Sequence, residues 1–168
     1  MASVGSPTVF QVNSQLSNSG YQCSDIIGKG TYSIVRLAWS KKLAKNVAIK
    51  IIDTRSKSDY IVRFLPRELK IVPTLNHNNV VKVYDASFFV FFNKKLRCVD
   101  QVVHLDTTVC IIQEYADGKD LLCEIKKRGR IEENIAKFLI RQLVEALEVR
   151  ICIKLIHAST FIAVDFSL

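Results

Sequence analysis

The sequence predicts an α+β fold, in which a five-stranded antiparallel sheet with one helix is followed by a helical part. Segments with alternating or β-branched apolar residues occur at 21–27, 34–40, 47–52, 80–89 and 108–114, as expected for strands. A short polar turn at 41–46 is typical of a hairpin. From Ile131 onward apolar residues recur at helical spacing, and one face collects Ile135, Phe138, Leu139, Leu143, Ala146 and Leu147.

The first 20 residues precede this pattern and differ from it in composition. They are rich in Ser, Asn and Gln, which favours a flexible tail. The folded domain is therefore expected over residues 21–168. With 49% hydrophobic and 24% charged residues, a chain of this length can bury a single core.

The turn between the first two strands is rich in glycine and has the sequence Gly28-Lys29-Gly30-Thr31-Tyr32-Ser33. Gly28 and Gly30 carry no side chain that would keep backbone amides away from an anionic ligand, and Lys50 supplies a positive charge at a fixed register. A dinucleotide-binding fingerprint is the alternative, but it requires a helix directly after the glycines. Because two strands follow here, a phosphate-covering loop is favoured.

A helix is predicted from Pro66, since proline is well tolerated at the first helical position. Leu69, Val72 and Leu75 would form its buried face. Pro73 lies inside this pattern, where a proline removes a backbone donor and costs about 3 kcal/mol. We therefore expect a kink or an end near Val72.

Two further segments carry no recognisable site. Residues 91–106 mix phenylalanines with charged residues between the last two strands, and we interpret them as an insertion. The basic cluster at 126–130 lies between apolar segments without interleaved aromatic residues, which favours a solvated loop.

The glycine-rich loop and the strand Val47-Ala48-Ile49-Lys50 that follows it resemble the eukaryotic serine/threonine protein kinases. The runs at 64–69 and 76–81 are similar to the calcium/calmodulin-dependent kinase group, in particular the testis-specific serine kinases. The resemblance extends from about residue 21 to 148. It implies an N-lobe at 21–116, a C-lobe fragment at 117–168, and phosphoryl transfer from ATP, with Mg²⁺, to serine or threonine of a protein.

The resemblance also assigns ATP-binding roles. Lys50 would hold the α- and β-phosphates and pair with Glu68, beneath the loop formed by Gly28, Lys29 and Gly30. The pocket for the base and the ribose would be formed by Val35, Ala48, Gln113, Glu114, Ala116 and Asp120. In this set the two apolar side chains cover adenine, backbone groups of Glu114 and Ala116 form the hinge, and Gln113 takes the gatekeeper position. Asp120 would contact the ribose hydroxyls.

The sequence departs from the family at three motifs. Ser33 stands where kinases carry a third glycine. None of the three histidines is followed by Arg-Asp, so no catalytic residue is identifiable. Asp165, followed by Phe166 and then a serine in place of glycine, is a weak candidate metal ligand, and a chance dipeptide in an apolar tail is favoured over it. We expect little or no activity, from either a C-terminally truncated kinase or a noncatalytic, pseudokinase-like binding or regulatory module, and the sequence leaves both open.

Charge and cysteine content limit the other function classes. The formal charge of +8 is spread along the chain, so nucleic acid is not predicted as a partner. No apolar run is long enough to span a bilayer, so membrane insertion is not predicted. The five cysteines lack metal-ligand spacing, which favours reduced thiols in a cytoplasmic protein. The expected partners are ATP and a protein substrate or regulator that the sequence does not identify.

Overall fold

The computed structural model describes residues 9–31, 33–54, 58–90, 94–97, 107–118 and 121–152. Its centre is a six-stranded sheet in the order β1-β2-β3-β6-β4-β5, with every neighbouring pair antiparallel. The strands are β1 (Tyr21–Lys29), β2 (Ser33–Ser40), β3 (Lys45–Asp53), β4 (Val83–Val90), β5 (Lys94–Arg97) and β6 (Thr107–Glu114). The five predicted strands are confirmed. The sixth, β5, lies in the 91–106 segment and was not predicted.

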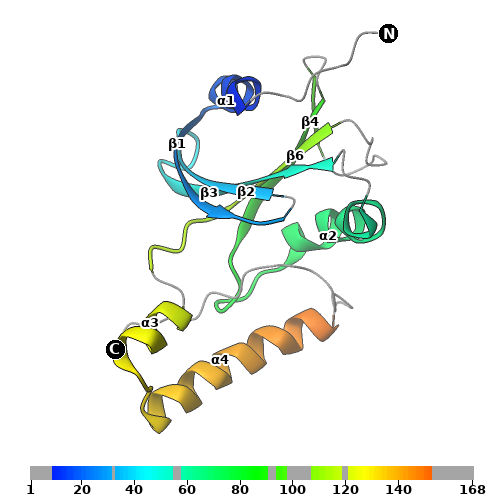
Figure 1. Cartoon of the computed structure of the whole chain (residues 1–168). Helices are drawn as coiled ribbons and strands as arrows, with labels where there is room; N and C mark the ends of the chain where they lie inside the picture. The colour runs from blue at the N-terminus through cyan, green and yellow to red at the C-terminus, as the bar shows by residue number, and fades with distance from the viewer. Residues whose placement is uncertain are drawn as a thin grey trace.

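Four α-helices accompany the sheet within the described residues: α1 (Val9–Asn18), α2 (Leu65–Ile71), α3 (Leu121–Arg128) and α4 (Glu133–Cys152). Figure 1 shows α1 against one side of the sheet and α2 against the other, with α3 and α4 together at the far end of the molecule from α1. Within the described part of the chain, no helix is both long and apolar enough to cross a membrane.

The segment predicted to be a flexible tail instead contains α1. Val12 and Leu16, one helical turn apart, are buried against the sheet, and Leu16 is fully buried. The carboxamide Oδ1 of Asn13 accepts a hydrogen bond from Arg36 Nη1 at 2.7 Å, which ties the helix to β2. The overall polar composition obscured this narrow apolar stripe, because the other side chains of the helix can remain in water.

The sheet separates two clusters of buried side chains. The outer cluster, beneath α1, consists of Val12, Leu16, Tyr21, Ala38, Val47, Ile49, Cys110 and Ile112. The inner cluster, beneath α2, consists of Ile52, Ile61, Leu65, Leu69, Val72, Val83, Ala86, Val109 and Ile111. Successive residues of β3 and β6 therefore alternate between the two clusters, as the pleat of a strand requires.

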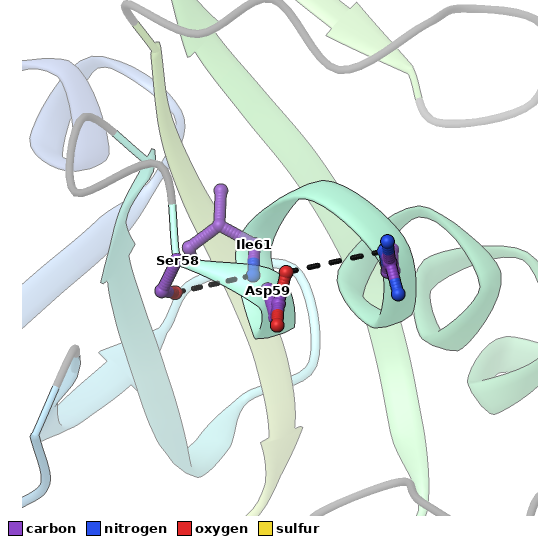
Figure 2. A network of polar contacts seen from close by, with 4 residues as sticks. Ser58, Asp59 and Ile61 are labelled. Atoms are coloured by element: carbon purple, nitrogen blue, oxygen red, sulfur yellow. Dashed lines mark hydrogen bonds and ion pairs between the residues drawn. The ribbon is translucent and has the colours of Figure 1, made fainter.

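The helix before β4 begins earlier than Pro66, because Ser58 caps it. Ser58 Oγ accepts a hydrogen bond from the N–H of Ile61 at 3.4 Å (Figure 2), the usual arrangement at a helix N-cap. Figure 2 also shows the ion pair that Asp59 forms at 3.9 Å with Arg63 one turn later. Both of its side chains are exposed, so it contributes little to stability.

Two prolines shape the rest of this helix. Residues Tyr60–Phe64 form a π-helical turn in which the N–H of Leu65 donates to the carbonyl of Tyr60. The next residue, Pro66, has no N–H to continue the pattern. Helix α2 then ends at Ile71 and a 3₁₀ turn (Val72–Thr74) contains Pro73, which confirms the predicted end near Val72.

The basic cluster at 126–130 is not a loop throughout, since Arg128 is the last residue of α3. Gly129 follows with a positive φ of 78°, and its N–H donates to the carbonyl of Ile125 at 2.8 Å. This backbone conformation favours glycine and closes the helix.

The apolar face predicted for α4 is only partly buried. Leu139 and Ala146 are buried, but Phe138 is 48% exposed and Leu143 38%. The buried side includes Gln142. The helix that was predicted from Ile131 is therefore present, beginning at Glu133, and much of its apolar surface remains accessible.

The loop after α2 holds α4 in place. Asn79 Nδ2 donates to the carbonyl of Gln142 at 3.3 Å and to Glu145 Oε2 at 3.0 Å. The backbone N–H of Asn79 itself donates to His77 Nδ1 at 3.2 Å, so the loop is ordered from within. These contacts connect the sheet region to the helical part of the chain.

Candidate functional site

The pairing of the strands brings five of the predicted ATP-binding residues onto one face of the sheet. Gly28 lies opposite Val35, Val35 opposite Lys50, and Ala48 opposite Gln113. Residues directly opposite one another in antiparallel strands point to the same side. Because Ala48 and Lys50 are two positions apart on β3, all five residues share the face that packs on α2.

The two glycines of the loop differ in how much room each leaves for a side chain. At Gly30 the N–H donates to the carbonyl of Ser33 at 2.8 Å, and an added Cβ would lie only 3.1 Å from Ser33 Oγ. At Gly28 an added Cβ would make an ordinary contact of 3.5 Å with Val35. Nothing in the described structure therefore excludes a side chain at Gly28, whereas a ligand approaching the backbone closely would exclude one. Lys29 is exposed.

Lys50 is a buried cation, with only 8% of its surface exposed. Burial lowers its pKa, and the attraction of the Glu68 carboxylate opposes part of that effect. Glu68 lies on α2 and is 3% exposed. The structure thus places the predicted lysine and carboxylate within electrostatic reach of one another, in surroundings that strengthen the interaction of Lys50 with any anion.

Sequence reasoning missed Tyr60, whose hydroxyl donates to Glu68 Oε2 at 2.9 Å. Its ring packs against the inner cluster. The bond fixes the orientation of the carboxylate that acts on Lys50. Ser58 could have indicated this contact in the sequence, because a serine cap there starts the helix before Tyr60. Tyr60 then lies about two turns before Glu68 and on the same face.

The predicted hinge begins at the end of β6. The N–H of Glu114 donates to the carbonyl of Lys82 at 2.8 Å, and Glu114 Oε2 accepts from the N–H of Lys82 at 3.2 Å. Ala116 is exposed. These bonds fix the point at which the chain leaves the sheet. Asp120 and Asp165 lie outside the described residues.

Gln113 precedes the hinge and is unusual among the site residues. Its side chain is 9% exposed, and its carboxamide makes no hydrogen bond within the described parts of the chain. Burying an amide without a partner costs about 1–3 kcal/mol. Ala48, directly opposite, is also buried and carries no polar side-chain group.

The described residues include no group of three or more His, Cys, Asp or Glu side chains that could hold a metal ion.

The site as described offers groups for an anion and for an aromatic base. These are backbone amides of the loop, the buried Lys50, a small apolar wall at Val35 and Ala48, and a hinge. This combination suits a nucleotide.

Comparison with known proteins gives an independent result. Residues 21–160 match the model of the protein kinase domain. The chain is 40% identical over 133 residues to testis-specific serine/threonine-protein kinase 3 of Homo sapiens, which is 79% of this chain and 44% of that protein. It is 36% identical over 134 residues to testis-specific serine/threonine-protein kinase 2 of Mus musculus, or 79% of this chain and 33% of that protein. The chain thus spans less than half the length of these relatives.

Proposed function

Because this chain belongs to the protein kinase domain family and is a relative of serine/threonine kinases, we propose that the sheet face bearing Lys50 binds ATP. The observation that carries the proposal is a buried lysine facing a buried carboxylate on the same sheet face as a glycine-rich turn. The reaction that this site serves is transfer of the terminal phosphate of ATP to serine or threonine of a protein.

Phosphoryl transfer requires positioning and neutralisation of charge rather than covalent chemistry by the protein. Lys50 neutralises phosphate charge from a fixed place on β3, and Glu68 keeps its ammonium group charged and oriented. Backbone amides around Gly28 donate to phosphate oxygens. Backbone N–H and C=O groups of the hinge after Glu114 form hydrogen bonds with the edge of the adenine. Bound Mg²⁺, which the family uses, supplies further neutralisation of the phosphates.

Lys50→Met is expected to weaken binding of ATP about tenfold or more, since a hydrogen bond to a charged group contributes roughly 1.5–3 kcal/mol. Isothermal titration calorimetry with ATP and Mg²⁺ measures the effect. Lys42→Met is the matched control, because Lys42 is an exposed lysine in the turn before β3 and its loss should leave the affinity unchanged. Equal affinity of the wild type and Lys50→Met would contradict the proposal.

A second function, a noncatalytic binding or regulatory module, is favoured by one sequence observation. His77, His104 and His157 are the three histidines of the chain, and none is followed by Arg-Asp. A residue that accepts the proton of the substrate hydroxyl typically contributes a factor of about 10²–10⁴ to the rate. Under this proposal the protein binds ATP and engages the partners of an active relative without transferring phosphate.

The 168-residue chain is accordingly expected to transfer no more radiolabelled phosphate from ATP to serine/threonine peptides than Lys50→Met does. Casein or a mixed peptide library serves as the acceptor. Incorporation that exceeds the Lys50→Met background several-fold would show that another acid performs the missing role, and would favour the kinase over the regulatory module.

We also propose that the protein acts in the cytoplasm. Among the residues that the structure describes, Cys23, Cys110 and Cys123 form no disulfide, which supports a reducing compartment. The protein substrate or regulatory partner is left open by this proposal.

A further inference from the structure

The side chain of Arg36, on β2, joins helix α1 to the strand that leads into the glycine-rich turn. Its Nη1 donates to Asn13 Oδ1 of α1 at 2.7 Å. Its Nε donates to the backbone carbonyl of Ser24 on β1 at 3.1 Å, and its Nη2 donates to the same carbonyl. The Ser24 hydroxyl in turn donates to the carbonyl of Leu37 at 3.2 Å. A single rigid guanidinium plane therefore connects one helix and two strands.

Ser24 lies where β1 pairs irregularly with β2. The register shifts between Cys23 and Ile26 and again between Ile26 and Gly28, and an irregularity of this kind disrupts the ladder of backbone hydrogen bonds. Arg36 is opposite Ile26, so its side chain is placed beside the shift and supplies donors to the Ser24 carbonyl. Contacts of the Arg36 side chain thus support β1 where its pairing is interrupted, just before the glycine-rich turn.

Helix α1 holds Arg36 from the other side. Arg36 points to the outer face of the sheet, since it is opposite Ile49 of the outer cluster. Val12 and Leu16 of α1 are buried in the same cluster, and Asn13 lies between them in the helix. Because these two apolar side chains anchor α1 on the sheet, the carboxamide of Asn13 meets Arg36 from a fixed position.

The strand that Arg36 supports sets the place of the glycine-rich turn. β1 is an edge strand of the sheet, and such strands move more readily than central ones. Val35, the residue before Arg36, is opposite both Gly28 and Lys50. Any movement of β1 relative to β2 therefore shifts the amide of Gly28 with respect to Lys50.

We infer that Arg36 is a positioning residue for the glycine-rich turn, and that α1 is the brace that holds Arg36 in place. Where it concerns nucleotide, the inference rests on the proposed binding of ATP. A turn that is already held near its bound position loses less conformational freedom when ATP binds. Docking of α1 and binding of ATP then favour one another, although α1 lies on the opposite side of the sheet from α2 (Figure 1), and linkage makes the coupling reciprocal.

Amide hydrogen exchange of the nucleotide-free protein, followed by NMR, tests the brace directly. In Asn13→Ala, which removes one hydrogen bond, the amides of Gly28 and Gly30 should exchange about fivefold faster than in the wild type. In Arg36→Lys, which keeps the charge but loses the planar fork, the increase should be about tenfold or more. Asn18→Ala is the matched control, because Asn18 is an exposed asparagine of the same helix, and its exchange should equal that of the wild type.

The amides of β3 serve as the internal reference, since a general loss of stability accelerates them as well. The expected result is acceleration in the turn with unchanged exchange in β3. Equal exchange of the turn in the wild type, Asn13→Ala and Arg36→Lys overturns the inference. An acceleration that β3 shares in proportion also overturns it, because Arg36 then contributes to overall stability and does not position the turn.

A second measurement adds ATP and Mg²⁺. Exchange of the α1 amides in the wild type should slow about fivefold, and calorimetry should show that Arg36→Lys binds ATP about fivefold more weakly. If the wild type binds ATP and neither effect occurs, the coupling of α1 to the site is overturned. If the wild type binds no ATP, the proposed function is overturned, whereas exchange of the nucleotide-free protein still decides whether Arg36 positions the turn.

Discussion

Replacing Glu68 with glutamine is expected to lower the free energy of unfolding by about 3–5 kcal/mol, because removing one partner of a buried ion pair leaves the other charge uncompensated. The substitution keeps the size of the side chain, so the inner cluster is not disturbed. Lys50 loses the attraction that opposes the effect of burial on its pKa. Urea unfolding at neutral pH measures the loss.

The same variant should regain stability as the pH rises. Burial places the pKa of Lys50 in the folded chain below its ordinary value of 10.5. At pH values between the lowered pKa of the folded chain and the ordinary pKa of the unfolded chain, the unfolded chain binds more protons than the folded chain. Stability therefore increases with pH in this interval. Without Glu68 the folded pKa of Lys50 falls further, so the interval widens. The deficit of Glu68→Gln relative to the wild type should therefore shrink as the pH rises through the lowered pKa of Lys50.

Two controls separate charge from other effects. In the double variant Lys50→Met and Glu68→Gln, the buried cation is absent and the pH dependence of the deficit should vanish. Tyr60→Phe removes the other partner of the carboxylate while leaving the charge, and should cost only about 1 kcal/mol. A deficit of Glu68→Gln that is small and constant with pH would mean that the two groups do not interact in solution.

Replacing Leu16 with alanine is expected to lower the free energy of unfolding by about 2–5 kcal/mol, the range for truncating a fully buried leucine. Leu16 is 0% exposed and belongs to the outer cluster with Ile49 and Ile112. A helix of ten residues is marginal on its own. We therefore expect α1 to detach when this side chain is removed, with an additional loss of helical circular dichroism.

Ser17→Ala is the matched control for Leu16→Ala, since Ser17 is the next residue of α1 and is exposed. A substitution at such a surface position usually changes stability by less than about 0.5 kcal/mol. If both variants unfold at the same urea concentration, the packing of α1 on the sheet contributes nothing to the stability of the domain.

The arrangement of the sheet could be predicted because its strands carry strong local patterns. The alternating residues of β2 and the β-branched run of β3, which includes Ile49 and Ile51, specify strands without help from distant contacts. The two apolar residues of α1 give no comparable signal, because two apolar side chains in a polar segment predict a buried helix only when the sheet against which they pack is known. β5 likewise depends on pairing with β4, a tertiary contact that no short segment reveals.

The candidate site shows the same division. Lys50 and Gly28 follow from short motifs, and strand register then brings them to one face. Tyr60 could not be predicted as a partner of Glu68 while the helix was expected to begin at Pro66. Within the described residues the carboxamide of Gln113 has no hydrogen-bond partner. This depends on the residues that surround it in the fold and not on its neighbours in the sequence. Sequence therefore indicates candidate ligand-binding groups more readily than the side chains that orient them.

The position of β3 in the sheet has a consequence for how the site fluctuates. β3 is paired along its length with β2 and with β6, and Val47, Ala48, Ile49 and Lys50 are buried, so its amides should exchange with deuterium only when the whole domain opens. β1 is an edge strand with one partner, and the amide of Gly28 should exchange orders of magnitude faster than those of β3. We therefore expect Lys50, the lysine of the proposed ATP site, to lie in the slowest-exchanging segment, and the amides of the glycine-rich turn to exchange without unfolding of β3.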